Sequence, residues 1–260
     1  MLTVDNLTFA YKKNTPPTLD KISFKLSPGE IGIFLGSNGS GKSTLFKALL
    51  GLVKADSGNV QFNNSDLLHM SNRKKAQLIS YVPQNITFGE LSVYDTIMLG
   101  RLSHFSLTPS REDYSCVNDI IEEMHLTRLL RQDVNSLSGG EKQKIAIAQA
   151  LAGKPEILIL DEPTSNLDYS NIELTMSEIF NISRSKNITV LCSFHDINQA
   201  MSIGDSYFFL KDGQLVYSGD EAIIDSELLL DVYGMNAKIA DIDGRKLVIA
   251  DYKLHTKGEY

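Results

Sequence analysis

The N-terminal part of the chain alternates apolar and polar residues, a pattern typical of half-buried β-strands. It covers residues 2–11 and 19–35, with a turn signal at 28–29, and predicts an edge of antiparallel sheet. Residues 31–35 then run into a glycine-rich loop, and residues 43–50 carry apolar side chains at helical spacing. The predicted order is strand, loop and helix.

Helical periodicity dominates the middle of the chain, from about residue 86 to residue 154. Ser110 and Asp113 have the spacing of a capping box, and apolar residues recur at helical spacing over 114–129. This pattern predicts a separate helical lobe.

Strand patterning returns in the C-terminal part of the chain. Strand-like segments at 157–160, 189–192 and 207–210 are separated by helical stretches at 170–185 and 196–203. Strands that are joined through helices imply crossover connections, so we predict a parallel sheet.

These changes of periodicity divide the chain into three predicted parts. Residues 1–85 hold the antiparallel strands and the glycine-rich loop, residues 86–154 form the helical lobe, and residues 155–260 complete the core and add a tail. A polar segment begins at Lys253, and we expect it to fray.

Composition limits the class of protein. The chain has 260 residues, of which 42% are hydrophobic, so it can bury about 70–75% of its unfolded surface. A charged content of 22% with 18 glycines and 7 prolines excludes a collagen-like or broadly disordered chain. The 25 basic and 32 acidic side chains leave a net charge of −7, which argues against non-specific binding to nucleic acid or anionic lipid.

The two cysteines, Cys116 and Cys192, lie far apart, which is neither a disulfide framework nor a metal-ligand spacing. We expect reduced thiols in an intracellular protein. The N-terminus lacks the basic and apolar segments of a secretory signal. No run approaches the roughly 18 apolar residues of a membrane-spanning helix, so the sequence predicts a soluble protein.

Residues 36–44 match the phosphate-binding P-loop pattern, GxxxxGK followed by Ser or Thr, between a predicted strand and a predicted helix. Glycines let backbone N–H groups converge on the phosphates, and the helix adds the positive end of its dipole. Lys42 would reach the β- and γ-phosphates, Ser43 would bind Mg²⁺, and Thr44 would assist at the α- or β-phosphate. An ordinary tight turn is the alternative. The candidate nucleotide-binding residues are Gly36, Ser37, Asn38, Gly39, Ser40, Gly41, Lys42, Ser43 and Thr44.

The aliphatic segment at 157–160 ends in two carboxylates, Asp161 and Glu162, which is a Walker B pattern. Successive side chains on a strand point to opposite faces, but at a strand end the second carboxylate can swing toward the γ-phosphate. We expect Asp161 to hold Mg²⁺ through water and Glu162 to polarise the attacking water. The alternative is a solvated acidic pair at the sheet edge.

A second glycine turn, LSGGE at 137–141, precedes an amphipathic helix. Ser138 and Glu141 can form a capping box, which is sufficient to start a helix. The approachable N–H groups beside Gly139 and Gly140, the hydroxyl and the helix dipole also make a phosphate site. The residues alone leave both interpretations open.

Six motifs, in this order, resemble those of the ATP-binding cassette (ABC) transporter ATPases, and the resemblance covers nearly the whole chain. They are the P-loop at 36–44, YVPQ at 81–84, which is similar to the Q-loop, LSGGE at 137–141, ILILDEP at 157–163, SNLD at 165–168, which is similar to the D-loop, and SFHD at 193–196. Tyr11 matches the aromatic residue that stacks on adenine in the family. Glu141 stands where the family usually has Gln, and Lys144 and Gln149 stand where it often has Arg.

The resemblance implies an α/β fold: a P-loop NTPase core with a mostly parallel sheet, an antiparallel β subdomain and an α-helical lobe. It implies an ATPase that takes ATP with Mg²⁺ and forms a head-to-tail homodimer in the ATP-bound state. In that dimer the P-loop of one subunit and Ser138, Gly139 and Gly140 of the other sandwich ATP, which gives the second glycine turn its use.

The resemblance also implies roles for two further side chains. Gln84 would contact Mg²⁺ or the nucleophilic water and report the nucleotide state to a membrane partner, and His195 would hydrogen-bond the γ-phosphate. The catalytic candidates are thus Glu162, His195 and Gln84. The metal-binding candidates are Ser43, Gln84 and Asp161.

Residues 91–101 and 228–233 look similar to the import ATPases for iron–siderophore complexes, haem, cobalamin and, in some relatives, molybdate. This implies a chain at the cytoplasmic face of the cell membrane, associated with separate integral-membrane permease subunits. An extracytoplasmic solute-binding protein would belong to the full system.

Three alternatives remain at this point. An exporter ATPase shares the same cassette chemistry. A soluble ABC protein acting on DNA or ribosomes usually carries a long coiled-coil insert or a second cassette; neither occurs in this sequence, so we expect no nucleic-acid partner. A regulatory module without turnover is disfavoured because Lys42, Glu162 and His195 are all present.

Overall fold

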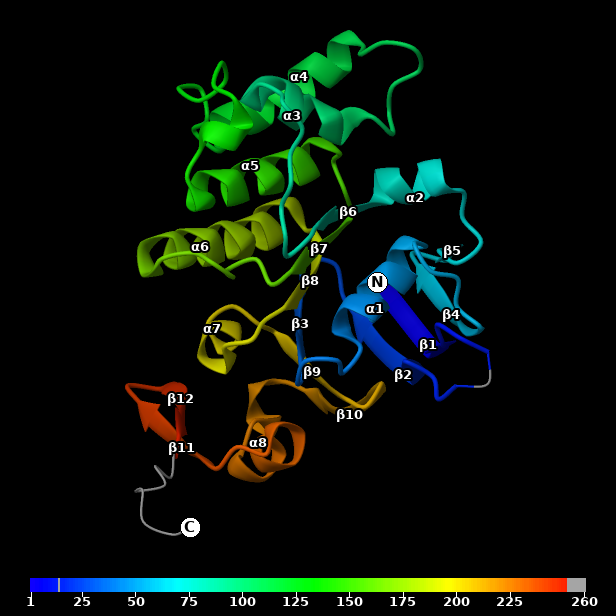
Figure 1. The fold of residues 1–260 in the computed structure, drawn as a ribbon, viewed down its shortest axis with the longest axis vertical. Coiled ribbons are helices and arrows are strands. Elements are labelled where there is room, and N and C mark those ends of the chain that lie inside the picture. The colour runs from blue at the N-terminus through cyan, green and yellow to red at the C-terminus, as the bar shows by residue number, and fades with distance from the viewer. Residues whose placement is uncertain (14, 252–260) are drawn as a thin grey trace, which may run out of the picture.

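The computed structural model describes residues 1–13 and 15–251, and the polar segment expected from Lys253 lies outside them (Figure 1). A six-stranded sheet in the order β10-β9-β3-β8-β7-β6 forms the centre. Its strands are β3 (Ile31–Leu35), β6 (Ile79–Val82), β7 (Ile157–Asp161), β8 (Thr189–Ser193), β9 (Ser206–Lys211) and β10 (Gln214–Gly219). Neighbouring strands are parallel except β9 and β10. The predicted α/β fold with a mostly parallel sheet is confirmed.

A second, antiparallel sheet has the order β2-β1-β4-β5. Its strands are β1 (Leu2–Phe9), β2 (Leu19–Leu26), β4 (Ser57–Phe62) and β5 (Ser65–Asp66). Alternation buries Leu2 and Val4 of β1, as the period-two pattern predicts. The helix α1 (Lys42–Leu50) lies beside this sheet (Figure 1), and its Leu45 and Phe46 belong to one apolar cluster with residues of both sheets. The phosphate loop is therefore attached to a helix that contacts both sheets.

The other end of the molecule is helical (Figure 1). Its elements are α3 (Val93–Met98), the 3₁₀ turn η1 (Leu99–Arg101), α4 (Arg111–Glu123), the 3₁₀ turn η2 (Val134–Ser136) and α5 (Gly139–Ala152). The predicted capping box of Ser110 and Asp113 is present at the start of α4. Asp113 also forms a buried ion pair with Arg101, whose Nε lies 2.9 Å from Oδ1. This pair ties η1 to α4.

The remaining elements surround the central sheet and extend toward the C-terminus. They are α2 (Asn72–Leu78), α6 (Tyr169–Lys186), α7 (Ile197–Met201), the 3₁₀ turn η3 (Glu221–Ile223), α8 (Ser226–Tyr233), β11 (Ala237–Ile242) and β12 (Arg245–Ala250). Helices α6 and α7 confirm the helical stretches expected at 170–185 and 196–203. The sequence reasoning missed the β11–β12 hairpin, which forms a separate two-stranded sheet.

Cys116 and Cys192 are both buried free thiols, as expected. Burial raises the pKa of Cys192, because it disfavours the charged thiolate. Across residues 1–13 and 15–251, no helix has the length and apolar character needed to cross a membrane.

Candidate functional site

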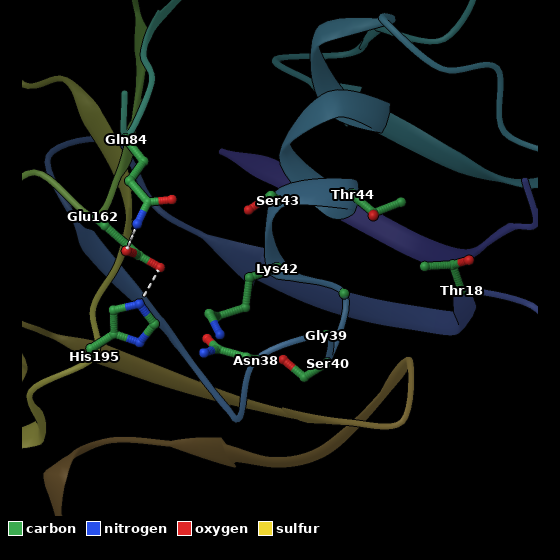
Figure 2. Close-up of a pocket in the computed structure, with 11 residues that line it drawn as sticks. Thr18, Asn38, Gly39, Ser40, Lys42, Ser43, Thr44, Gln84, Glu162 and His195 are labelled. Carbon is green, nitrogen blue, oxygen red and sulfur yellow. Dashed lines mark hydrogen bonds and ion pairs between the residues drawn. The ribbon is translucent and has the colours of Figure 1, made fainter. Parts of the chain in front are cut away.

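A cleft of about 510 Å³ opens where the carboxyl ends of the central strands meet the phosphate loop. Figure 2 shows side chains that line it from several separate segments of the chain. The lining residues are Thr18, Asn38, Gly39, Ser40, Gly41, Lys42, Ser43, Thr44, Gln84, Glu162 and His195. Residues predicted from the P-loop, together with Glu162 of the acidic pair, Gln84 of the Q-loop and His195, thus meet in one cavity.

Glycine permits the shape of the phosphate loop at both of its ends. Gly36 has φ 146° and Gly41 has φ 112°, in the region that L side chains rarely adopt. A Cβ on Gly36 would also collide with the carbonyl oxygen of Leu210 on β9. Gly41 precedes α1 and, among the described residues, no side chain caps this helix. Its first N–H groups are therefore available to a phosphate.

Lys42 lies inside the loop and is 6% exposed. Its Nζ donates to the carbonyl oxygens of Gly36 at 2.7 Å and Ser37 at 3.2 Å. Burial lowers the pKa of Lys42, and the negative charges of Glu162 and Asp161 oppose that shift. A partly desolvated cation that faces two carboxylates is suited to a polyanionic ligand. Gly36 and Ser37 do not line the cleft themselves but hold this lysine.

Glu162 occupies a strained backbone position, with φ 53° in the left-handed region. This turn at the end of β7 directs the side chain into the cleft, where it is flanked by two partners (Figure 2). Gln84 Nε2 donates to Oε2, and His195 Nε2 lies 2.7 Å from Oε1. The predicted swing of the second carboxylate thus has a backbone cause.

Asp161 does not line the cleft and is 4% exposed. Its carboxylate accepts a hydrogen bond from Ser193 Oγ at 2.6 Å and one from the Tyr81 hydroxyl at 3.4 Å. The Ser193 hydroxyl also accepts the backbone N–H of Glu162 at 2.9 Å. Burial, together with the charge of Asp161, raises the pKa of Tyr81 to about 12, so the phenol remains a donor at neutral pH. One buried serine thus connects both acidic residues.

The cleft offers oxygen ligands of the kind that Mg²⁺ prefers. The Ser43 hydroxyl lines it, and the carboxamide of Gln84 has its oxygen on the side facing Ser43 (Figure 2). The 3%-exposed Ser40 hydroxyl has no hydrogen-bond partner among the described residues. Within residues 1–13 and 15–251, no group of three or more His, Cys, Asp and Glu could hold a metal by protein ligands alone. The donor set therefore fits a hard cation that a phosphate ligand shares.

Tyr11 lies outside the cleft lining and is 57% exposed. Its hydroxyl lies 3.4 Å from Oγ1 of Thr44, which does line the cleft. Its ring packs edge-on against Phe9 at 4.9 Å between centroids. A solvent-exposed aromatic face near the end of the phosphate loop is compatible with stacking on a base.

The second glycine turn is not part of the cleft lining in this chain. Its capping-box interpretation is confirmed: Glu141 N–H donates to Ser138 Oγ, and Glu141 Oε2 accepts from Ser138 N and Oγ at 2.9 and 2.8 Å. These hydrogen bonds lower the pKa of Glu141. Gly140 faces the side chain of Asn171 on α6, where a Cβ would collide. The phosphate-binding interpretation of Ser138, Gly139 and Gly140 stays a prediction.

Two of the departures from the family pattern have clear local partners. Glu141 completes the capping box described above, and Lys144 pairs with Glu178 on α6 at 2.7 Å. Helix α5, which begins at the second glycine turn, is therefore locally supported.

Sequence reasoning missed two residues at this site. Thr18 lines the cleft from the segment before β2, and no local motif marks it. Ser193 is the last residue of the buried strand β8 and stands opposite Asp161 in the parallel register. A polar residue at the carboxyl end of an apolar strand was the available signal.

Comparison with known proteins identifies relatives along nearly the whole chain. The family model of the ABC transporter matches residues 19–165. The molybdate/tungstate import ATP-binding protein WtpC of Methanocaldococcus jannaschii is 34% identical over 249 residues, covering 95% of this chain and 78% of the relative. The ferric enterobactin transport ATP-binding protein FepC of Escherichia coli is 31% identical over 251 residues, covering 94% and 92%.

Solved structures that are similar to this chain also come from ABC transporter proteins. An inward-facing transporter structure described as metal-chelate type matches with a TM-score of 0.83 and 30% identity, covering 97% of this chain and 98% of that one. A dimeric ATP-binding cassette bound to ADP and phosphate in a post-hydrolysis state matches with a TM-score of 0.75 and 27% identity, covering 85% and 98%.

The position of Ser193 leads to a prediction for Ser193→Ala. We expect kcat for ATP hydrolysis to fall at least about tenfold, because both acidic residues lose an anchor, and the free energy of unfolding to fall by about 1–2 kcal/mol. Steady-state kinetics and urea denaturation measure the two effects.

Ser183→Ala is the matched control. Ser183 is equally buried and hydrogen-bonded, but it bonds the carbonyl oxygens of Gly29 and Ile188, away from the acidic pair. Its loss should lower stability to a similar extent and leave kcat unchanged. Equal effects of the two variants on kcat would contradict the role given to Ser193.

Proposed function

The chain belongs to the ABC transporter family as one of the ATP-binding ATPases that drive transport, and from this premise we propose that it energises solute uptake. The solute is an iron–siderophore, haem, cobalamin or related metal complex, carried by separate permease subunits. The observation that carries the solute class is the similarity to FepC, whose name assigns it to ferric enterobactin transport, over 94% of this chain.

ATP occupies the 510 Å³ cleft in this proposal. The free N–H groups at the start of α1 and the loop around Asn38 bind the phosphates, while Lys42 moves from the loop carbonyls to the β- and γ-phosphate oxygens. Tyr11 stacks on the adenine at the exposed end of the loop. Ser43 and Gln84 hold Mg²⁺, with Asp161 acting through water. The cation supplies charge neutralisation at the phosphates.

Glu162 polarises the attacking water. Its carboxylate is held from two sides by Gln84 and His195, which fixes its orientation before any substrate arrives. His195 turns from Glu162 toward the γ-phosphate when ATP is present, which frees a carboxylate oxygen for the water. The Ser193 link keeps Glu162 aligned during this exchange.

Each reaction centre is completed by a second copy of the chain. Ser138, Gly139 and Gly140 do not line the cleft of their own subunit, and LSGGE is exposed at Ser138 and Gly139. A head-to-tail homodimer would bring this helix start to the γ-phosphate in the opposite cleft. The solved relative bound to ADP and phosphate is dimeric, which supports the proposal. The proposed assembly further includes integral-membrane permease subunits at the cytoplasmic face of the membrane, with an extracytoplasmic solute-binding protein.

A second candidate solute is a metal oxyanion. WtpC, named for molybdate/tungstate import, is 34% identical over 95% of this chain. The two candidates share the same ATPase chemistry and differ in the membrane partner, so the solute has to be found with that partner present.

Stimulation of the ATPase tests the solute class. The chain is co-purified with its membrane partner, reconstituted in lipid vesicles and assayed with a ferric siderophore, haem, cobalamin or molybdate. We expect a metal complex to stimulate hydrolysis and to accumulate in the vesicles that take up solute. Stimulation by molybdate alone would identify a metal oxyanion as the solute. Transport of the solute in the direction opposite to uptake would identify an exporter.

Glu162→Gln tests the hydrolytic assignment. The amide keeps the size of the side chain but cannot accept the water proton, so we expect kcat to fall at least about a hundredfold while an ATP-bound dimer accumulates. Light scattering after gel filtration with Mg²⁺-ATP detects the dimer. Glu122→Gln, at an exposed position on α4, is the control and should turn over normally. Rapid hydrolysis by Glu162→Gln would show that another group activates the water.

Ser138→Arg tests the shared site. The large cation should block turnover but leave nucleotide binding by the single subunit intact, as measured by fluorescent ATP titration. Ser110→Arg is a close control, because Ser110 forms the same type of capping box at the start of α4 without the glycines. It should lose helix stability and keep hydrolysis. Equal loss of binding and turnover in Ser138→Arg would count against the composite site.

A further inference from the structure

The C-terminal hairpin is attached to the helix that follows His195. Asn198, the second residue of α7, uses both ends of its carboxamide on one residue of β12. Its Nδ2 donates to the carbonyl oxygen of Val248 at 3.1 Å, and the N–H of Val248 donates to Oδ1 at 2.8 Å. This pair of hydrogen bonds, here called the Asn198 clamp, imitates a neighbouring strand at Val248.

The Asn198 clamp lies beside a gap in the packing between the hairpin and α7. Between α7 and the turn of the hairpin lies a cavity of about 340 Å³, with Met201 and Ser202 on one side and Gly244 and Leu247 on the other. A two-stranded hairpin is marginally stable by itself and depends on such packing. Figure 1 shows the hairpin next to helix α7, and the Asn198 clamp is a main point of contact between the two.

On its other side, α7 is attached to the segment after Glu162. Gln199 Oε1 accepts a hydrogen bond from Thr164 Oγ1 at 2.8 Å. Asp196 caps the helix through the N–H groups of Asn198 and Gln199. Helix α7 thus lies between the hairpin and the loop that begins with the catalytic carboxylate.

The position of His195 depends on this helix. The His195 side chain is 50% exposed, whereas its partner Glu162 is 10% exposed. Packing therefore restrains the imidazole weakly. The distance between the imidazole and Glu162 depends instead on the position of the backbone that leads into α7. A helix of five residues has little stability of its own, because nucleation costs more than so few hydrogen bonds return. Its orientation must come from its attachments to the rest of the fold, which are the buried side chains of Ile197 and Ala200 and the hydrogen bonds of Asn198 and Gln199.

We propose that Asn198 is a positioning residue for the hydrolytic site: by fixing α7 to the C-terminal hairpin, it sets the distance over which His195 reaches Glu162 and the γ-phosphate. This inference rests on the proposed role of His195. It gives the hairpin a function in turnover, although the hairpin contributes no residue to the cleft.

Asn198→Ala is the first test. We expect kcat to fall about tenfold, because a misplaced group costs rate rather than binding, while ATP affinity stays unchanged since the phosphate loop lies on other elements. The exchange rate of the Val248 amide hydrogen should rise. The control is Asn181→Ala, at an exposed asparagine on α6, which should change neither kcat nor the exchange rate of the Val248 amide hydrogen.

A double-mutant cycle separates positioning from general destabilisation. In the His195→Ala background, Asn198→Ala should cause no further loss of kcat, because the group that it positions is already absent. Losses that multiply would overturn the inference. If His195→Ala itself kept full activity, the proposed role of His195 would fail first, which distinguishes the two failures.

Val248→Pro approaches the same contact from the hairpin. Proline removes the N–H that donates to Asn198, so this change, far along the chain from His195, should reproduce the loss of kcat. Asn198→Asp keeps the acceptor for that N–H and should retain more activity than Asn198→Ala. Thermal unfolding of each variant checks that the fold is intact. Full activity in both Asn198→Ala and Val248→Pro would overturn the proposal.

Discussion

The Ser193 hydroxyl links the two acidic residues at the end of β7 through its two hydrogen bonds. The hydroxyl donates a hydrogen bond to the carboxylate of Asp161 and accepts one from the backbone N–H of Glu162. Period-two alternation alone would send these neighbouring acids to opposite faces. The left-handed turn at Glu162 and the serine from the adjacent strand overcome that tendency. The carboxylate of Glu162 then lies between Gln84 and His195, and the other residues of the cleft surround it.

The two glycine-rich helix starts of this chain differ in a way that suits different tasks. Helix α5 satisfies two of the N–H groups at its start, those of Ser138 and Glu141, through its capping box, whereas α1 begins at Gly41 without a side-chain cap from the described residues. An uncapped start leaves donors for a ligand within the same subunit. A capped, exposed start is stable alone and can meet a ligand held by another molecule. This contrast supports the proposed composite site, in which a second copy of the chain completes the cleft.

Local patterns predicted much of this molecule, and tertiary neighbours explain what they missed. The strands, the capping boxes at Ser110 and Ser138, and the phosphate loop each depend on residues within a few positions, so the sequence displays them directly. Thr18 lines the cleft beside the phosphate loop and Ser193 bonds the acidic pair, but both are far in the chain from these neighbours, so the spacing of the motifs does not mark them. The β11–β12 hairpin was missed because its clearest attachment, the pair of hydrogen bonds between Asn198 and Val248, joins residues that are far apart in the chain. The expected roles of Tyr11 and Asp161 concern a ligand, and the positions of these residues are compatible with them.

The central strand β3 has consequences for how the chain is made. It pairs with β8 and β9, so Ile33 stands opposite Cys192 on one side and Tyr207 on the other. The Leu210 carbonyl, which meets Gly36, lies further on still. The ribosome must therefore synthesise most of the chain before strands β8 and β9 can pack beside the phosphate loop. A nascent chain that is released before this point contains the P-loop motif but not the complete cleft. Nucleotide binding is acquired late in synthesis, although its best-known signature emerges near the beginning.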